Sequence, residues 1–231
     1  MNDGDKGIRQ SEDYLKARKI FESILLNVPI EYPRKRGVGV LPSPAEKFEK
    51  NCLEFYEKWQ ESKRISEILR GLKTRVEYPS DVYKSMSKLL VYLGLVESLG
   101  VALVDMALML LIATGKEVHT RGAFTKHVTS FKELADIDLG YKLDFLESEG
   151  LDLFKRFINR DLRNHIAHLK FTIENNGEIR KRNGVPIHID NEISRFWDGV
   201  DTLKLVLEDS GFLERLETAS LLVKSERGNK P

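Results

Sequence analysis

The sequence predicts an all-α protein with one small β-hairpin, and three observations lead to this class. Apolar residues recur at intervals of three and four along much of the chain, as they do in amphipathic helices. Residues 89–113 are apolar all round, which places a helix at the centre of a bundle. After residue 170 the pattern alternates, and Asn176-Gly177 is a strong hairpin turn.

Residues 1–75 are expected to form an N-terminal helical extension. Helical spacing predicts a first helix over residues 8–28, which Pro29 ends because proline disfavours helix in the residue before it. A second helix over residues 44–72 starts at Ser43-Pro44-Ala45-Glu46. There serine is a cap, proline suits the first helical position and glutamate completes a capping box.

Residues 76–224 are expected to form the main helical domain, followed by a flexible tail over residues 225–231. Its predicted elements are helices over residues 81–114, 124–134, 139–148 and 151–168, the hairpin, a long helix from about Asp190 to Gly211, and a short helix to residue 223.

Composition excludes few classes of function. The net charge of +1 indicates neither a nucleic-acid nor a membrane protein as a whole, so any electrostatic argument is local. Cys52 is the only cysteine, which fits a reducing cytosol, and the first residues lack a signal peptide pattern. Residues 89–113 are long enough to span a bilayer, but Glu97 and Asp105 within them favour a buried helix of a soluble, cytoplasmic protein.

Residues that bind phosphate and transfer protons are concentrated in Arg160-Asp161-Leu162-Arg163-Asn164-His165-Ile166-Ala167-His168. Arginine presents a fixed cationic fork to phosphate oxygens, and histidine exchanges a proton near neutral pH. Asparagine adds a hydrogen-bond donor and an acceptor without charge.

This run resembles the signature of the HEPN superfamily, in which an arginine, often followed by a polar residue, precedes a histidine by four to six positions. Here these residues are Arg163, Asn164 and His168. The resemblance extends over about residues 80–210, in the order apolar helix with acids, motif helix, hairpin and closing helix. It implies a HEPN-like helical bundle that forms homodimers, with the paired motifs lining one cleft.

The resemblance also implies a function: metal-independent cleavage of RNA, in RNA processing or as a toxin or defence effector, with no cofactor. The 2′-hydroxyl attacks the adjacent phosphate, His168 acts as general base or acid, and Arg163 stabilises charge on the phosphate. Asn164 orients either the histidine or the phosphate. Arg160 and His165 are supporting candidates, and the family's acidic residue on another core helix corresponds to either Glu97 or Asp105, between which the sequence does not decide.

Basic residues crowd the segment around the motif, as phosphate binding requires. The candidates for RNA binding are Lys155, Arg156, Lys170, Arg180, Lys181 and Arg182. The sequence departs from the family at Lys170. HEPN toxins paired with a nucleotidyltransferase antitoxin usually have tyrosine two residues after the histidine, where this chain has Lys170. Such a partner is therefore disfavoured, although an antitoxin or another regulatory protein is still considered as a partner.

The spacing of the motif raises a geometric question. Arg163 and His168 are five residues apart, so on a regular helix they point about 140° away from each other. Two arrangements reconcile them. Either the helix ends or distorts near Ala167, or the site is shared between two chains.

Other interpretations compete with the nuclease. A non-catalytic HEPN-like module would bind RNA or a protein, with the motif residues buried against Glu97 or Asp105. A plain helical adaptor would expose an apolar patch instead of a charged cleft. The motif residues would then cap carbonyls and pair with buried acids. A divalent metal on His165, His168 and Asp161 is disfavoured by the neighbouring arginines.

Overall fold

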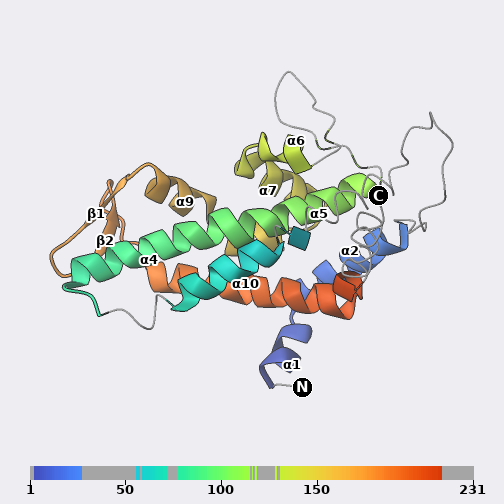
Figure 1. Cartoon of the computed structure of the whole chain (residues 1–231), viewed down its shortest axis with the longest axis horizontal. Coiled ribbons are helices and arrows are strands. Elements are labelled where there is room, and N and C mark those ends of the chain that lie inside the picture. The colour runs from blue at the N-terminus through green and yellow to red at the C-terminus, as the bar shows by residue number, and fades with distance from the viewer. Residues whose placement is uncertain are drawn as a thin grey trace, which may run out of the picture.

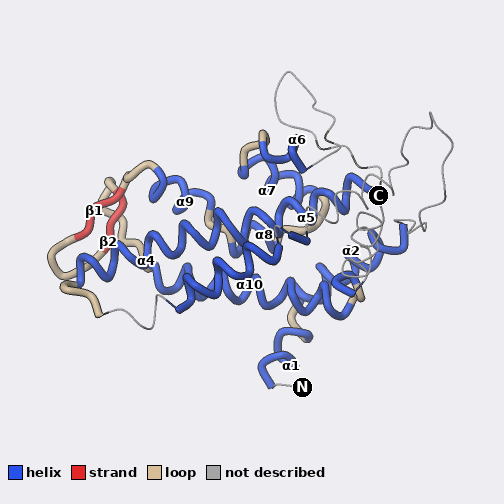
Figure 2. The backbone as a smooth tube through the Cα atoms, in the orientation of Figure 1, coloured by secondary structure: helices blue, strands red, loops and turns tan. Residues whose placement is uncertain are grey.

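The protein is mostly helical, with a two-stranded sheet, in a computed structural model that describes residues 3–27, 56–57, 59–71, 77–114, 116, 118, 128 and 131–214 (Figures 1 and 2). The all-α class is thereby confirmed. The elements are α1 (Asp3–Arg9), α2 (Glu12–Asn27), α4 (Asp81–Leu95), the π-helical turn η1 (Val96–Gly100), α5 (Val101–Ala113), α6 (Phe131–Ala135), α7 (Leu139–Ser148), α8 (Leu153–Phe157), α9 (Arg160–Ala167), β1 (Phe171–Ile173), β2 (Ile179–Lys181) and α10 (Ile189–Asp209).

Some predicted elements lie partly outside the described residues. Residues 59–71 are helical, in agreement with the second predicted helix, but the capping box at 43–46 is not among the described residues. The same holds for most of the helix expected at 124–134, for the short helix expected to reach residue 223, and for the tail.

A single long helix, formed by α4, η1 and α5 in succession, runs through the core (Figure 1). Ser80 caps its start by accepting a hydrogen bond from the Tyr83 amide. The stretch Asp81–Ile112 is long and apolar enough to cross a membrane, and 78% of its most apolar window is buried inside the protein. That burial agrees with the core helix predicted from its two carboxylates. The π-helical turn in the middle was not foreseen.

Helix α10 packs along the central helix and also contacts α2 and α8 (Figure 1). Phe157 of α8 lies between two other aromatic rings, those of Phe154 and Phe196, with ring centroids 5.6 Å from it on both sides. The same Phe157 ring lies directly over Gly199 of α10, where a Cβ atom would overlap it. Glycine at this position therefore lets α8 and α10 approach closely.

The N-terminal helices share this core. Tyr14 and Phe21 of α2 are fully buried. The Arg9 guanidinium donates two hydrogen bonds to the Asp209 carboxylate, at 2.6 and 3.0 Å, and the Tyr14 hydroxyl donates a third. These contacts link α1 and α2 to the end of α10.

The prediction of one continuous helix over residues 151–168 is wrong, because the structure has two helices there, α8 and α9. Ile158 between them is extended, with φ −101° and ψ 96°. Asn159 then caps α9 by accepting a hydrogen bond from the Leu162 amide. An asparagine cap competes with helix continuation, since its side chain satisfies the backbone N–H that the previous turn would otherwise bind.

The predicted hairpin is confirmed, with Phe171 paired to Lys181 and Ile173 to Ile179. Its turn contains Asn176 and Gly177, whose φ of +80° is a conformation that favours glycine. The apolar side of the ribbon covers α4, and Ile179 is buried there.

We predict that Gly199→Ala destabilises the protein by about 1–3 kcal/mol, because the new methyl group meets a Phe157 ring that its aromatic neighbours hold in place. Chemical denaturation measures the change. Gly7→Ala in α1 is the matched control: nothing lies within 4 Å of the added Cβ, so the helix gains up to about 1 kcal/mol. Equal effects of the two substitutions would contradict the close approach.

We also predict acid destabilisation through Asp209, because hydrogen bonds from Arg9 above all lower the pKa of its carboxyl from 3.8 to about 2. The unfolded chain, with the ordinary pKa, takes up this proton first. The stabilisation is therefore complete above about pH 4 and is lost as the pH falls towards about 2. Asp209→Asn should lower the neutral-pH unfolding free energy by about 1–2 kcal/mol and flatten its acid dependence.

Urea denaturation at neutral and acid pH tests this prediction. Asp201→Asn is the control, because Asp201 is an exposed carboxylate of the same helix that forms no ion pair with a described residue. If wild type and Asp209→Asn lost stability in parallel on acidification, the Arg9–Asp209 contact would not be the cause.

Candidate functional site

Helix α9 carries the motif, and two other helices hold Asn159, the residue that caps its start. The Asn159 amide donates to the Tyr92 hydroxyl of α4 at 3.1 Å, and the Asn159 side chain donates to Glu192 of α10 at 3.2 Å. Tyr92 is fully buried, and this burial raises the pKa of its hydroxyl. Sequence reasoning did not include these three residues. Asn159, three positions before Leu162, carries the one signal that could have been used, a helix cap.

The motif helix ends at Ala167, as one of the two predicted arrangements requires. His168 is the residue that caps its end, and Leu169 has a φ of +51°. The Lys170 amide donates to the His165 carbonyl and the Leu169 amide to the Ile166 carbonyl, which together form a Schellman motif. Glycine normally occupies the left-handed position, and leucine there is strained. The Leu169 side chain is 67% exposed.

Arg163 is held in place by two neighbours. Its Nε atom donates to Glu97 Oε1 at 2.5 Å, and its Nη1 atom donates to Asn164 Oδ1 at 3.0 Å. The Arg163 side chain is 28% exposed and that of Glu97 is 42% exposed, so the pair lies at the surface. Glu97 belongs to η1, and π-helical turns of this kind often occur at functional sites.

The two acids considered for the site have different surroundings. Asp105 is buried and accepts a hydrogen bond from the Lys142 ammonium at 2.7 Å. Lys142 on α7 is buried as well, which makes this a charge pair inside the core. The structure therefore brings Glu97 to Arg163 and places Asp105 in a separate contact. A buried charge needs such a partner because desolvation alone is costly.

The two motif histidines differ in their hydrogen bonding. His165 is partly buried, and its Nδ1 lies 2.6 Å from the Asp161 carbonyl oxygen. A carbonyl only accepts, so Nδ1 carries the proton and the neutral ring has its lone pair on Nε2. His168 is exposed and forms no hydrogen bond through its ring to any described residue. No hydrogen bond joins the side chains of Arg163 and His168, which are both described.

Arg160 points to a different part of the molecule. Its guanidinium lies against Gly140 of α7, where a Cβ atom would overlap it. Arg160 thus contacts the helix that carries Lys142, and the structure does not bring it to the Glu97–Arg163 pair.

Half of the candidate RNA-binding residues already have partners. Lys155 forms ion pairs with Asp144 and Glu147, each at 2.6 Å. Arg156 pairs with Asp13 of α2 and with Asp152. Arg180 pairs with Glu178 and donates to the Gly184 carbonyl. Three candidates form no ion pair with a described residue, and all three lie in the hairpin or next to it: Lys170, Lys181 and Arg182.

Two hollows in the described part of the chain have no motif residue in their lining. One, of about 310 Å³, lies where the hairpin, α4 and α10 meet and is lined by Ser85, His188 and Asp190 among others. The other, of about 30 Å³, lies between α4 and α10. Within the described part of the chain, no three His, Cys, Asp or Glu side chains are grouped to hold a metal ion, and this includes Asp161, His165 and His168.

Comparisons with known proteins give no family for this chain. No family model, no curated protein and no solved structure matches it. The resemblance to the HEPN superfamily therefore depends on the motif and on the order of the elements around it.

We predict that Leu169→Gly stabilises the protein by about 0.5–1 kcal/mol, because glycine adopts the left-handed conformation without strain. Thermal or urea denaturation measures the gain. Leu169→Ala removes the same exposed side chain but keeps the strain, so its stability should stay within about 0.5 kcal/mol of wild type. Destabilisation by glycine would show that the Leu169 side chain makes a contact that offsets the strain.

Proposed function

We propose that the protein is a HEPN-type, metal-independent endoribonuclease whose reacting groups are Arg163 and His168. The observation that carries the proposal is the Glu97–Arg163 ion pair. It joins the π-helical turn of the central helix to the motif helix, at the surface, near the point where that helix ends in an exposed histidine. An arginine oriented in this way, five residues before an exposed histidine, suits phosphate chemistry.

The geometry of Arg163 supports a role in binding phosphate. Glu97 and Asn164 occupy the Nε and Nη1 atoms, and the Nη2 atom forms no hydrogen bond to a described residue. The guanidinium is thus fixed in orientation and still has donors directed elsewhere. Donors held in place before the reaction stabilise the charge that develops on phosphate oxygens without reorganising.

The reaction requires two proton transfers. The 2′-oxygen attacks the phosphorus and loses its proton, while the 5′-oxygen leaves and gains one, so the products are a 2′,3′-cyclic phosphate and a 5′-hydroxyl. His168 performs one of the transfers as base or acid. A homodimer would supply a second His168 for the other.

The hairpin is the proposed RNA surface. Lys170 follows His168 by two residues, and Lys181 faces Phe171 in the sheet register, so both cations lie on the segment that directly continues the motif. Together with Arg182 they would bind phosphates along the strand.

The alternative is a HEPN-like module that binds RNA or a protein without cleaving. It is favoured by the ion pairs of Lys155 and Arg156, which act as contacts between helices. In that case the Glu97–Arg163 pair is also structural.

We predict that the purified protein cleaves single-stranded or structured RNA in EDTA and that Arg163→Ala and His168→Ala each lower the rate by about 10²–10⁴. Gel analysis of labelled RNA measures cleavage, and end-group analysis should find 2′,3′-cyclic phosphates. A 2′-deoxy residue at the cleaved position should block the reaction. His188→Ala is the matched control, because His188 is also an exposed histidine, at the start of α10.

Binding measurements distinguish the alternative. If the protein bound RNA but left it intact, and both site variants bound as tightly as wild type, the catalytic proposal would be wrong and the binding module would stand. Cleavage that required a divalent metal would contradict the proposed mechanism in a different way.

A further inference from the structure

Leu169 has an unusual backbone conformation for its residue type. Among the residues that the structure describes, it is the one non-glycine residue with a positive φ, at +51°. Elsewhere in the described chain this region is occupied by glycine, at Gly150, Gly177, Gly184 and Gly211. In the left-handed region a Cβ atom comes close to the backbone, so leucine there costs free energy that glycine would not.

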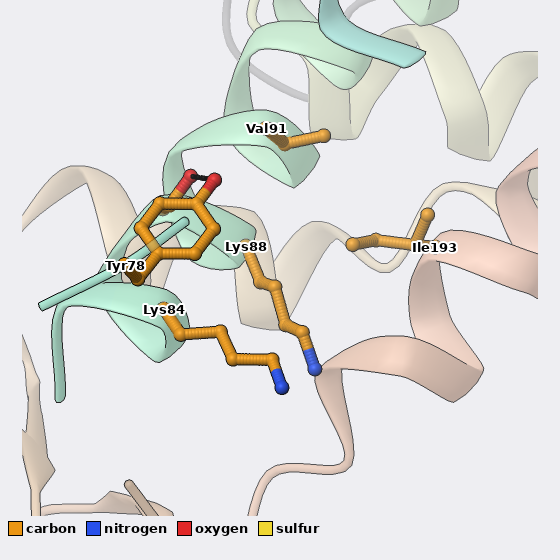
Figure 3. Close-up of a pocket in the computed structure, with 6 residues that line it drawn as sticks. Tyr78, Lys84, Lys88, Val91 and Ile193 are labelled. Atoms are coloured by element: carbon orange, nitrogen blue, oxygen red, sulfur yellow. Dashed lines mark hydrogen bonds between the residues drawn. The ribbon is translucent and has the colours of Figure 1, made fainter. Parts of the chain in front are cut away.

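The side chain of Leu169 does not offset this cost within the described fold. It is mostly exposed, and it lines neither of the two hollows, the smaller of which is shown in Figure 3. The backbone is held by two hydrogen bonds that do not involve the side chain, from the Leu169 amide at 3.0 Å and from the Lys170 amide at 2.8 Å. Strained residues that their surroundings hold in place are typical of functional sites, which indicates a contact outside the described fold.

The neighbours of Leu169 indicate what it contacts. His168 precedes it and is the group that transfers protons in the proposed function. Lys170 follows it and forms no ion pair with a described residue. All three residues are exposed, on the segment that leads from the end of α9 to β1. A nucleotide combines a charged phosphate with the apolar face of its base, and three consecutive residues here offer groups that match both parts.

We propose that Leu169 packs against the base of the nucleotide next to the cleaved phosphate, so that the substrate is RNA that is unpaired at this nucleotide. The inference rests on the proposed nuclease function. In an A-form duplex the faces of each base are covered by its neighbours in the stack, and side chains reach them only where a nucleotide is unstacked. Leucine is among the side chains that enter a base stack in known complexes.

The size of the contact favours a base over a protein surface. One leucine buries far less than the roughly 800 Å² that each partner contributes to a standard protein interface. A single base, by contrast, presents a face that one side chain covers. Leu169 thus selects the substrate, while Arg163 and His168 act on the phosphate.

The test compares cleavage of one labelled RNA by the full chain in three forms: single-stranded, fully paired, and paired with one bulged nucleotide. Wild type should cleave the single strand and the bulge at least tenfold faster than the duplex. Leu169→Gly and Leu169→Ala should each lower kcat/KM on the unpaired forms by about 5–10-fold, mainly through KM, because the contact is already made in the bound substrate. Leu169→Met keeps the apolar volume and should stay within about twofold of wild type.

The glycine variant separates the base contact from a loss of folding. Leu169→Gly is expected to be more stable than wild type, so its lower activity would have to come from the missing side chain. Leu15→Ala is the control, because Leu15 of α2 is also an exposed leucine, at 55%. Its kcat/KM should equal that of wild type.

The outcomes distinguish this inference from the nuclease proposal. If wild type cleaved RNA but Leu169→Gly did so with an unchanged kcat/KM, or if wild type cleaved the duplex as fast as the single strand, the base contact would be wrong and the nuclease would stand. If wild type left all three RNAs intact, the nuclease would be wrong, and binding would decide the contact. Leu169→Gly should then raise the dissociation constant for the single strand by about 5–10-fold and leave that for the duplex unchanged.

Two further results would overturn the base contact. One is equal binding of single-stranded RNA by wild type and Leu169→Gly, or no binding by either. The other is binding of wild type, but not of Leu169→Gly, to phosphatidylserine vesicles while RNA cleavage stays the same, which would assign Leu169 to a membrane surface.

Discussion

The burial of one apolar helix is the constraint on which the rest of this structure depends. The helix from Asp81 to Ala113 is too apolar to face water, so the other described helices cover it from several sides. Its two carboxylates must still be accommodated, and the protein does so in two ways. Asp105 stays inside with Lys142, whereas Glu97 reaches the surface and pairs with Arg163.

The π-helical turn explains how Glu97 reaches the surface from a helix that is otherwise buried. A wider turn inserts a residue and changes which face of the helix the following residues occupy. Residues before η1 and after it can then both be buried, while Glu97 within the turn is exposed. Such turns carry a cost in hydrogen-bond geometry, and the strained backbone of Leu169 adds another irregularity on the motif segment. The two departures thus lie at Glu97, the partner of Arg163, and directly after His168.

The sequence predicts the class of fold because its signals are periodic and local. The apolar run and the Asn176-Gly177 turn each act within a few residues, and the elements they predict are present. The sequence analysis did not predict the break between α8 and α9. The capping residue, Asn159, lies in a segment whose apolar stripe continues on both sides of it. Nor did it choose between Glu97 and Asp105, which differ only in tertiary partners. The same reason explains why Lys155 and Arg156 were assigned to RNA: the carboxylates that pair with them come partly from other helices.

The contact between Arg9 and Asp209 has a consequence for how the chain is made. The two residues are 200 positions apart, so this contact cannot form until nearly the whole described chain has left the ribosome. Helix α10, which also covers the central helix, is synthesised late for the same reason. During translation the apolar helix is therefore synthesised well before α10, which covers it. Contacts of such long range slow folding and prolong the exposure of apolar surface. Until then, the newborn chain is open to aggregation through this helix.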